Sequence, residues 1–349
     1  MSLKPEADAR RKRRAPKRAI TMDEIARLAA VSKPTVSRAL QDSPLVNRTT
    51  KERIAAIAAK HGYIVNRNAR RLWGKRANTI AVILQLPPSG GRAVSAPFIF
   101  QLLADTARAL ANRHQDVLLR SAESHETQPY QKMLAAKAAD GLIFLGQGAH
   151  SEWLNELGRT NTPLVVWGAV DDAQAYCAIG SDNFKGGLLA GQRFAGLGRK
   201  RALFVGNRAH AEMELRRKGL EAGLRADRSR ASVVDLQIAD FAFDTAYSAM
   251  REFLARRSQP VDAIFAASDT VAMAAIVALR EARQRVPEDV SVIGYNDIPF
   301  AAHFTPPLST VRQDTHQAGA LLVEKLFQIL DGEQPTSVKL PTELVIRQT

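Results

Sequence analysis

The sequence predicts an α/β protein in which a small all-helical head precedes a larger core of two α/β lobes. Three observations carry this prediction. The 349 residues exceed one small domain and suit a short module attached to a larger body. Helical patterns alone follow position 20, whereas short apolar runs alternate with helical patterns from Thr79 onward. The excess positive charge lies entirely in the part of the chain before this change.

The charge distribution separates the two parts of the chain. Residues 1–76 carry 20 Lys or Arg and 6 Asp or Glu, whereas residues 77–349 carry 29 of each kind. A neutral body behind a basic N-terminal part predicts binding of a polyanion such as nucleic acid, although a solubilising charged tail would give the same counts. Residues 1–19 include the run Arg10–Arg14 and are expected to form a disordered basic tail. Such a tail either attracts phosphates without reading sequence or is a solvated arm.

Cysteine content and apolar runs bear on the compartment. Cys177 is the single cysteine, so the chain cannot form an internal disulfide, as is typical of cytoplasmic proteins. Residues 1–18 are too charged for a secretory signal, and no apolar run approaches the ~20 residues that a membrane helix requires. We therefore expect a cytoplasmic protein without a membrane partner.

A first helix is predicted to begin after Thr21. Thr21 and Glu24 have the spacing of a capping box, in which the threonine caps the first amides and the glutamate reaches back to the cap. Helical spacing predicts a buried face formed by Ile25, Leu28 and Ala29. A short turn over residues 30–32 follows, and Val31 is expected to point into the core between helices.

A second helix is predicted over Lys33–Leu40, with Ser32 as its cap and Pro34 in its first turn, where a missing N–H costs little. Val36 and Leu40 are expected to face inward. The residues left on the outward face are Lys33, Pro34, Thr35, Ser37 and Arg38. Two short helices across a three-residue turn are typical of a helix-turn-helix, whose second helix enters the major groove of DNA.

A third helix is expected to complete the head. Asn47 or Thr49 would cap it, and its buried stripe would comprise Ile54, Ile57 and Ala58. A generic three-helix unit without DNA-binding function would show the same apolar pattern.

The core pattern from Thr79 onward predicts parallel sheets covered by helices. Strands are expected at 79–86, 117–119, 141–145, 164–167, 202–205, 232–236, 263–267 and 290–294. Helices are expected at 100–113, 131–138, 152–159, 185–194, 214–224, 245–256 and 270–282. The alternation starts again after Gly180 and so predicts two lobes with a cleft between them. Ligands of such sheets bind outside the carboxyl ends of the strands.

Several stretches resemble the LacI/GalR family of bacterial regulators. In the head these are Thr21–Leu40, and His61–Asn66 with Ala69 and Leu72 after it. In the core they are Val290–Asp297, Thr305–Asp314 and Leu344–Arg347. The resemblance covers about Ile20 to Gln348, with two departures: Val65 stands where the family usually has proline, and Ala30 where glycine or asparagine is common.

The resemblance implies a periplasmic-binding-protein-like core and four parts of the chain. These are a disordered basic tail over 1–19, a helix-turn-helix DNA-binding domain over 20–65, a hinge helix or linker over 66–76, and an effector-binding and dimerisation core over 77–349.

The resemblance also implies contacts with operator DNA. By position, Leu72 is the hinge residue that wedges into the minor groove and kinks the duplex. It is flanked by Asn66, Arg67, Arg70 and Arg71. The residues expected to read bases are Lys33, Pro34, Thr35 and Arg38, with Arg38 suited to a guanine edge. Those expected to anchor phosphates are Ser32, Asn47 and Tyr63. Thr21 and Ser37 complete the expected DNA-binding set.

In this family the cleft binds a small metabolite, most often a sugar or a nucleobase. The corresponding candidates here are Phe98, Asp171, Arg216, Phe241, Ser268 and Asn296, of which Asp171 is the weaker. Carboxamide, hydroxyl and guanidinium groups satisfy ligand hydroxyls, and an aromatic ring covers an apolar sugar face, so a sugar or sugar derivative is expected and a purine stays open. Alternatively, Arg216 is a surface charge and the two phenylalanines are core residues. Asp269 is expected to cap the helix that follows it.

Motifs of enzymes and metal proteins are missing from the sequence. The seven histidines and one cysteine show no paired metal-ligand spacing, and neither a phosphate-binding Gly-rich loop nor a nucleophile elbow occurs. We therefore expect no catalytic residue, no metal and no cofactor. A sugar-processing enzyme would need an acid/base pair in the cleft, where Asp171 and Asp172 form the only adjacent pair. A periplasmic-type binding protein would need a signal peptide and no DNA-binding head, and an architectural DNA binder would not need the neutral body.

The expected function is that of a sequence-specific transcription regulator, with the resemblance favouring a repressor that a ligand releases from DNA. A homodimer would place two heads on a near-palindromic double-stranded operator. No leucine heptads follow the terminal motif, which favours a dimer over a tetramer. The sequence leaves open the effector, the operator, and the choice between inducer and corepressor.

Overall fold

The computed structural model describes residues 20–40, 42–63, 76–85, 97–122, 126–149, 151–225, 231–256 and 260–349. The chain divides into two compact units, Met1–Lys75 and Arg76–Thr349. Within the described residues, no helix is long and apolar enough to cross a membrane, and no group of three or more His, Cys, Asp or Glu is placed to hold a metal ion.

The described part of the first unit contains α1 (Met22–Leu28), α2 (Lys33–Leu40) and α3 (Arg48–Lys60). The predicted capping box is present, because Thr21 Oγ1 accepts the Glu24 N–H at 3.3 Å and the Glu24 carboxylate accepts the Thr21 N–H at 2.7 Å. Asn47, and not Thr49, caps α3: its Oδ1 accepts the Thr50 N–H at 2.8 Å.

Apolar side chains from these three helices form one small core. Its buried members are Ile25, Ala26, Ala29, Val36, Ala39, Val46, Ile54 and Ala58. The expectation for Leu28 was wrong, since its side chain is 48% exposed. The buried face of α1 includes Ala26 in place of Leu28, and the small side chain of Ala26 allows the close contact between α1 and α2.

The turn between α1 and α2 contains one of the two departures from the family pattern, Ala30. Ala30 has a φ of 50°, in the left-handed region that favours glycine and asparagine. The alanine therefore holds a conformation for which the more common residues are better suited.

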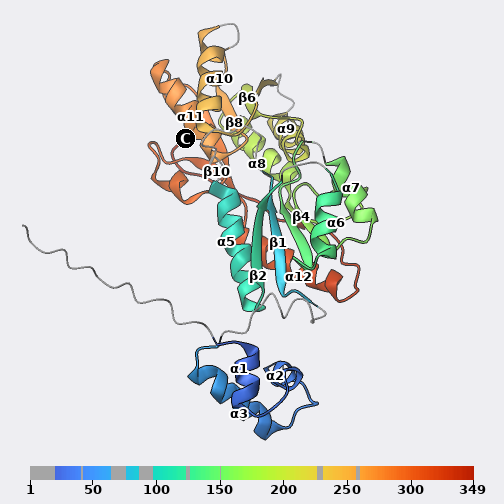
Figure 1. The fold of residues 1–349 in the computed structure, drawn as a ribbon. Helices are drawn as coiled ribbons and strands as arrows, with labels where there is room; N and C mark the ends of the chain where they lie inside the picture. Colours follow the sequence, from blue (N-terminus) through green and yellow to red (C-terminus); the bar gives the residue numbers. More distant parts are fainter. Residues whose placement is uncertain are drawn as a thin grey trace, which may run out of the picture. The chain divides into compact units, whose positions relative to one another are not determined.

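The first lobe of the core is a six-stranded sheet with the strand order β11-β5-β4-β3-β1-β2 and parallel pairing throughout. Its strands are β1 (Thr79–Leu84), β2 (Asp116–Ser121), β3 (Gly141–Leu145), β4 (Leu164–Trp167), β5 (Cys177–Ser181) and β11 (Val338–Leu340). Helices α5 (Pro97–Asn112) and α12 (Thr315–Leu330) cover one face, and α6 (Gln128–Ala135) and α7 (Glu152–Arg159) cover the other (Figure 1). In β1, Ile80 and Val82 pack toward α5, whereas Ala81 and Ile83 pack toward α7, so the strand is apolar at every position.

The second lobe repeats this plan, with the strand order β12-β10-β9-β8-β6-β7. Its strands are β6 (Arg201–Gly206), β7 (Ser232–Gln237), β8 (Ala263–Ala266), β9 (Ser291–Asn296), β10 (Ser309–Arg312) and β12 (Glu343–Val345), of which β12 runs antiparallel to β10. Helices α8 (Asn183–Gly196) and α9 (Ala211–Leu224) cover one face, and α10 (Phe243–Ala255) and α11 (Asp269–Glu281) cover the other. The short 3-10 helix Pro299–His303 follows β9.

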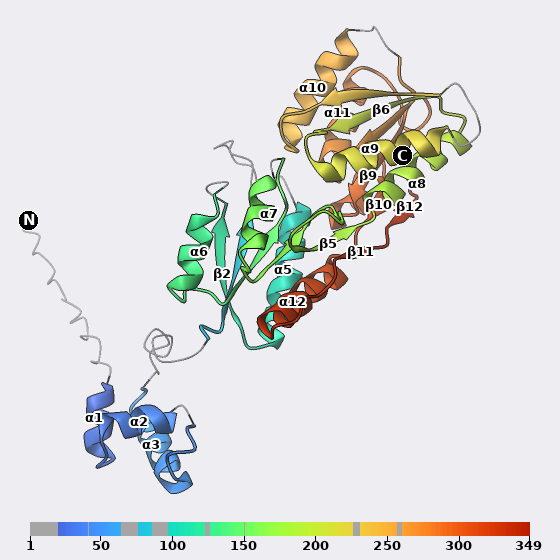
Figure 2. The same ribbon diagram turned by 90° about the vertical axis from the view of Figure 1, so that its right-hand side faces the viewer.

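The chain passes between the two lobes three times, from β5 to α8, from β10 to α12 and from β11 to β12 (Figure 2). The sequence predicts a single boundary between the lobes near Gly180. In the structure, α12 and β11 follow this boundary in the chain but belong to the first lobe. These two elements and strands β5 and β10 were not among the predicted ones. The strands are only three to five residues long and interrupted by polar residues or glycine, which hides their apolar pattern.

Candidate functional site

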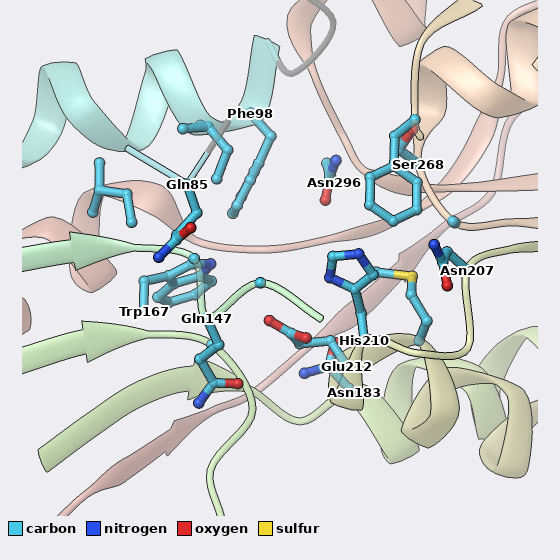
Figure 3. A pocket seen from close by; sticks show the side chains of 18 of the residues that line it. Gln85, Phe98, Gln147, Trp167, Asn183, Asn207, His210, Glu212, Ser268 and Asn296 are labelled. Carbon is cyan, nitrogen blue, oxygen red and sulfur yellow. The ribbon is translucent and has the colours of Figure 1, made fainter. Parts of the chain in front are cut away.

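A cavity of about 400 Å³ lies between the two lobes of the core (Figure 3). Most of its lining residues follow the carboxyl ends of strands in both sheets, the place where open parallel sheets bind ligands. The polar lining residues are Gln85, Gln147, Ser181, Asn183, Asn207, His210, Glu212, Arg216, Asp240, Ser268, Thr270, Asn296 and Gln313. The larger apolar side chains of the wall are Phe98, Ile99, Leu145, Trp167, Met213, Phe241 and Ile298.

Arg216 is buried in the wall of the cavity and makes no ion pair within the described residues. Its Nε donates to Asn183 Oδ1 at 2.8 Å, and its Nη1 donates to the Ala267 carbonyl oxygen at 2.7 Å. The guanidinium carbon lies 3.5 Å from the centre of the Tyr295 ring, a cation–π arrangement. Burial lowers the pKa of Arg216, and the electrostatic influence of Tyr295 and Glu212 opposes that shift. The alternative that Arg216 is a surface charge is therefore wrong.

The backbone of Arg216 is positioned by close packing of α8 against α9. A Cβ added at Gly187 would lie 2.0 Å from the Arg216 carbonyl oxygen, and one added at Gly219 would lie 2.0 Å from the Phe184 carbonyl oxygen. Both helices therefore depend on glycine where they cross. This crossing brings Asn183, at the first position of α8, within hydrogen-bond distance of the arginine.

Two aromatic pairs form opposite walls of the cavity. In the first lobe the rings of Phe98 and Trp167 have centroids 5.8 Å apart, and both side chains are 6% exposed. In the second lobe the rings of His210 and Phe241 have centroids 5.4 Å apart. Phe98 and Phe241 also pack against the lobe cores, so each is both a core residue and a wall of the cavity.

Asn296 and Ser268 reach the cavity from the ends of β9 and β8. Asn296 Oδ1 accepts a hydrogen bond from Gln313 Nε2 at 2.7 Å, which leaves the Asn296 amide group as a donor toward the cavity (Figure 3). Ser268 caps α11, since its Oγ accepts the Val271 N–H at 3.3 Å.

Asp269 was expected to cap α11, and this expectation was wrong. Its carboxylate is fully buried and accepts hydrogen bonds from the Ile298 N–H at 2.8 Å and from Thr310 Oγ1 at 2.5 Å. Burial raises the pKa of Asp269 to about 7, although both hydrogen bonds act in the opposite direction. The residue thus joins α11 to β10 and to the segment after β9.

Three polar atoms in the cavity wall have no hydrogen-bond partner within the described part of the chain: Gln85 Nε2, Ser181 Oγ and Glu212 Oε2. Gln147, by contrast, has its amide fully used, because its Nε2 donates to the Ala169 carbonyl oxygen and to the Tyr176 hydroxyl, and its Oε1 accepts the Ala169 N–H. Buried polar atoms are normally paired, so the three unpaired atoms mark positions that a bound molecule would satisfy.

The predicted effector set is largely brought together by the fold. Phe98, Arg216, Phe241, Ser268 and Asn296 all line the cavity. Asp171 does not: it is exposed in the loop after β4, and its Oδ1 accepts the Ala173 N–H at 2.8 Å. Sequence reasoning missed Gln85, Asn207 and Glu212, although the rule that ligands bind beyond strand ends already pointed to the first two.

The head presents a second candidate site along α2. Ser32, Lys33, Pro34 and Arg38 are exposed, Thr35 and Ser37 are half-buried, and Val36 is buried beneath them. Ser32 and Thr35 are joined through their hydroxyls at 2.8 Å, and Lys33 forms an exposed ion pair with Asp23 at 2.8 Å. These groups can exchange their partners for DNA at little cost, because exposed ion pairs are weak.

Of the six remaining DNA-binding candidates, three lie within the described residues. Thr21 is bonded to Glu24, Asn47 caps α3, and Tyr63 packs against the small core of the head. Asn66, Arg70 and Leu72 lie outside the described residues.

Comparison with protein families gives two matches, one in each unit of the chain. The family described as bacterial regulatory proteins of the lacI family matches residues 21–66, and the family described as a periplasmic binding protein-like domain matches residues 192–349.

Similar proteins extend over nearly the whole chain. The chain is 31% identical over 337 residues to the HTH-type transcriptional regulator CelR of Thermobifida fusca, covering 94% of this chain and 98% of the relative. It is 28% identical over 324 residues to the ribose operon repressor of Escherichia coli (strain K12), covering 90% and 94%.

Solved structures agree with these similarities. The lac repressor dimer bound to operator and the anti-inducer ONPF has a TM-score of 0.81 at 25% identity, covering 95% of this chain and 99% of that chain. The complex of the regulator CelR with cellobiose has a TM-score of 0.67 at 29% identity, covering 94% and 99%.

Proposed function

Because the chain belongs to the LacI family of bacterial regulatory proteins, we propose that it is a sequence-specific transcriptional repressor whose affinity for operator DNA is controlled by a saccharide. The observation that carries this proposal is the cavity between the lobes, in a chain whose head is a helix-turn-helix. The cavity combines amide, hydroxyl and guanidinium groups with aromatic walls, the surfaces that sugars require.

The proposal assigns the two units different tasks. The head, over residues 20–65, reads operator DNA, with the exposed residues of α2 in the major groove and the segment over 66–76 as the hinge. The core, over 77–349, binds the effector and joins two copies on a near-palindromic site. Relatives support this assignment: one was solved as a dimer bound to operator, and another with cellobiose.

The same proposal covers catalysis and location. The chain acts by binding alone and is not an enzyme, in keeping with relatives that are named as transcriptional regulators and repressors. It works in the cytoplasm, where its operator lies.

Effector control follows from the way the cavity is built. Arg216, Phe241 and Ser268 come from the second lobe, whereas Phe98 and Gln85 come from the first. A ligand that contacts both sides stabilises one relative position of the lobes over another, and this choice changes the spacing of the two hinges in the dimer. Ligand and operator then affect each other's affinity equally.

Fluorescence anisotropy tests the proposal. A labelled near-palindromic duplex from the promoter beside the gene is titrated with the full chain at fixed salt, and neutral sugars are then added. Release of the duplex by a sugar supports an inducible repressor. Equal affinity for the duplex and for random DNA, without any response to sugars, would refute it.

Two matched arginine variants test whether α2 recognises the bases of the operator. Arg38→Ala should reduce the preference for the specific duplex over random DNA by about 1–3 kcal/mol, because it removes a base contact. Arg48→Ala, in the exposed first turn of α3, should weaken both duplexes equally if it touches only phosphate. An unchanged preference in Arg38→Ala contradicts the assignment.

A further inference from the structure

We propose that Glu212 selects the effector by its charge: it accepts a hydrogen bond from a hydroxyl of an uncharged saccharide and rejects saccharides that carry a carboxylate or a phosphate. This inference rests on the proposed function, because it concerns the same cavity. Glu212 lies in the first turn of α9, and its carboxylate points into the cavity beside His210 (Figure 3).

The first observation is the unpaired oxygen of Glu212. Its Oε2 is buried, and none of the described residues gives it a hydrogen bond. A buried charged acceptor without a donor is strongly unfavourable, and the penalty disappears when a ligand supplies the donor. The free protein therefore keeps a group in the cavity whose stabilisation depends on the bound molecule.

Arg216 does not take the place of that donor. Its Nε and Nη1 are bonded to Asn183 and Ala267, and its guanidinium carbon lies 3.5 Å from the centre of the Tyr295 ring. Within the described residues no ion pair joins Arg216 to Glu212, although the Glu212 charge favours the protonated arginine at longer range. The arginine therefore leaves the Glu212 oxygen unsatisfied.

The charges that line the cavity favour an uncharged ligand. Glu212 and Asp240 bring two carboxylates against the single guanidinium of Arg216. Asp240 is already engaged, because its Oδ1 accepts the Ala242 N–H at 2.9 Å. An anionic ligand would meet the unpaired carboxylate of Glu212 directly, and like charges at short distance repel each other.

The first-lobe wall of the cavity offers hydrogen-bonding partners for hydroxyl groups. Gln85 Nε2 is an unpaired donor and Ser181 Oγ an unpaired hydroxyl, both in the first lobe. A hydroxyl both donates and accepts, so a polyhydroxylated molecule can donate to Glu212 on one side and accept from Gln85 on the other. An uncharged saccharide therefore satisfies all three unpaired atoms with one kind of group.

The test compares matched pairs of saccharides on the full-length chain. The pairs are glucose with glucuronate, galactose with galacturonate, and ribose with ribose 5-phosphate. Binding to the wild type, Glu212→Gln and Asp240→Asn is measured by calorimetry at one pH and salt concentration. Asp240→Asn is the control, since it removes the same charge from the same cavity but from a carboxylate that is already bonded within its own loop.

The wild type should bind the uncharged member of at least one pair about tenfold or more tightly than the anionic member. Glu212→Gln should reduce this ratio by about tenfold, whereas Asp240→Asn should change it less. The ligand-free Glu212→Gln protein should melt no lower than the wild type, because it loses an unpaired buried charge. A residue needed only for the structure would instead lower the melting temperature.

The alternative outcomes separate this inference from the proposed function. If an anionic member binds more tightly than its uncharged partner, or if the ratio is the same in Glu212→Gln and the wild type, the charge selection is refuted while saccharide control stands. An equal effect of Asp240→Asn also refutes it, because net charge and not Glu212 would then decide. If no member of any pair binds the wild type, the proposed function fails, and this inference fails with it.

Discussion

Replacing Arg216 by lysine separates the effector response from DNA binding. Lysine keeps the positive charge but offers a single ammonium, which cannot reach Asn183 Oδ1 and the Ala267 carbonyl oxygen together as the guanidinium does at 2.8 and 2.7 Å. One of these two buried acceptors then loses the donor that Arg216 supplies. Arg216 belongs to the second lobe and not to the head, so the protein should still bind operator DNA without effector.

The expected magnitude follows from these contacts. A hydrogen bond from a charged donor contributes about 1.5–3 kcal/mol, and part of the cation–π contact with Tyr295 is kept by an ammonium. The core should therefore lose about 2 kcal/mol of unfolding free energy. If the same displacement removes a contact with the effector, about 2 kcal/mol corresponds to roughly a thirtyfold weaker effector affinity.

Two assays decide the outcome. Urea unfolding of the core, followed by tryptophan fluorescence, measures stability, and anisotropy of a labelled operator duplex during effector titration measures release. The variant should bind the duplex within about twofold of the wild type and need more than tenfold more effector to release it. Release at the wild-type effector concentration, with unchanged urea midpoint, would refute the placement of Arg216 in the effector site.

Three further predictions test the packing and the electrostatics. Ala30→Gly should stabilise the head by up to about 1 kcal/mol, because φ is 50° at this position, and hydrogen exchange of α1 and α2 amides would measure the gain. Gly187→Ala should lower the free energy of unfolding by about 2 kcal/mol or more, because the new Cβ would lie 2.0 Å from the Arg216 carbonyl oxygen. Gly196→Ala, in the same helix, is the control: its new Cβ meets nothing within 4 Å, so it should leave stability unchanged or raise it slightly. Urea midpoints of the two variants make the comparison. Asp269 has a pKa raised to about 7 in the folded protein against 3.8 as its ordinary value, so the folded state binds its proton more tightly. The free energy of unfolding should therefore fall as the pH rises from about 4 to about 7, by about 4 kcal/mol for this group. Asp269→Asn should flatten that part of the pH dependence, and an equal slope in both proteins would show that other groups cause it.

The local elements of the head were determined by its sequence. Thr21 and Glu24 form the predicted capping box, and α2 has the predicted bounds Lys33–Leu40. Short-range spacing suffices here because caps and turns involve residues only three or four positions apart. The family resemblance and the fold class are confirmed by the matched families and by the relatives that cover nearly the whole chain.

The sequence also located most of the candidate cavity, since five of the six predicted effector residues line it. Those five follow strand ends or occupy one side of α9, positions that a parallel sheet brings to one edge. Asp171 differs because the loop after β4 folds back on itself, so its carboxylate is bonded to the Ala173 N–H. Nothing in the spacing of the sequence indicates that turn.

Only the tertiary structure decided how the groups in the cavity are paired. The Glu212 oxygen is unpaired because the guanidinium of Arg216 is held by Asn183 and Ala267, residues 33 and 51 positions away along the chain. The return of α12 to the first lobe likewise depends on contacts with α5. Hydrogen bonds and packing between such distant residues leave no periodic pattern in the sequence, whereas caps, strand ends and buried faces do.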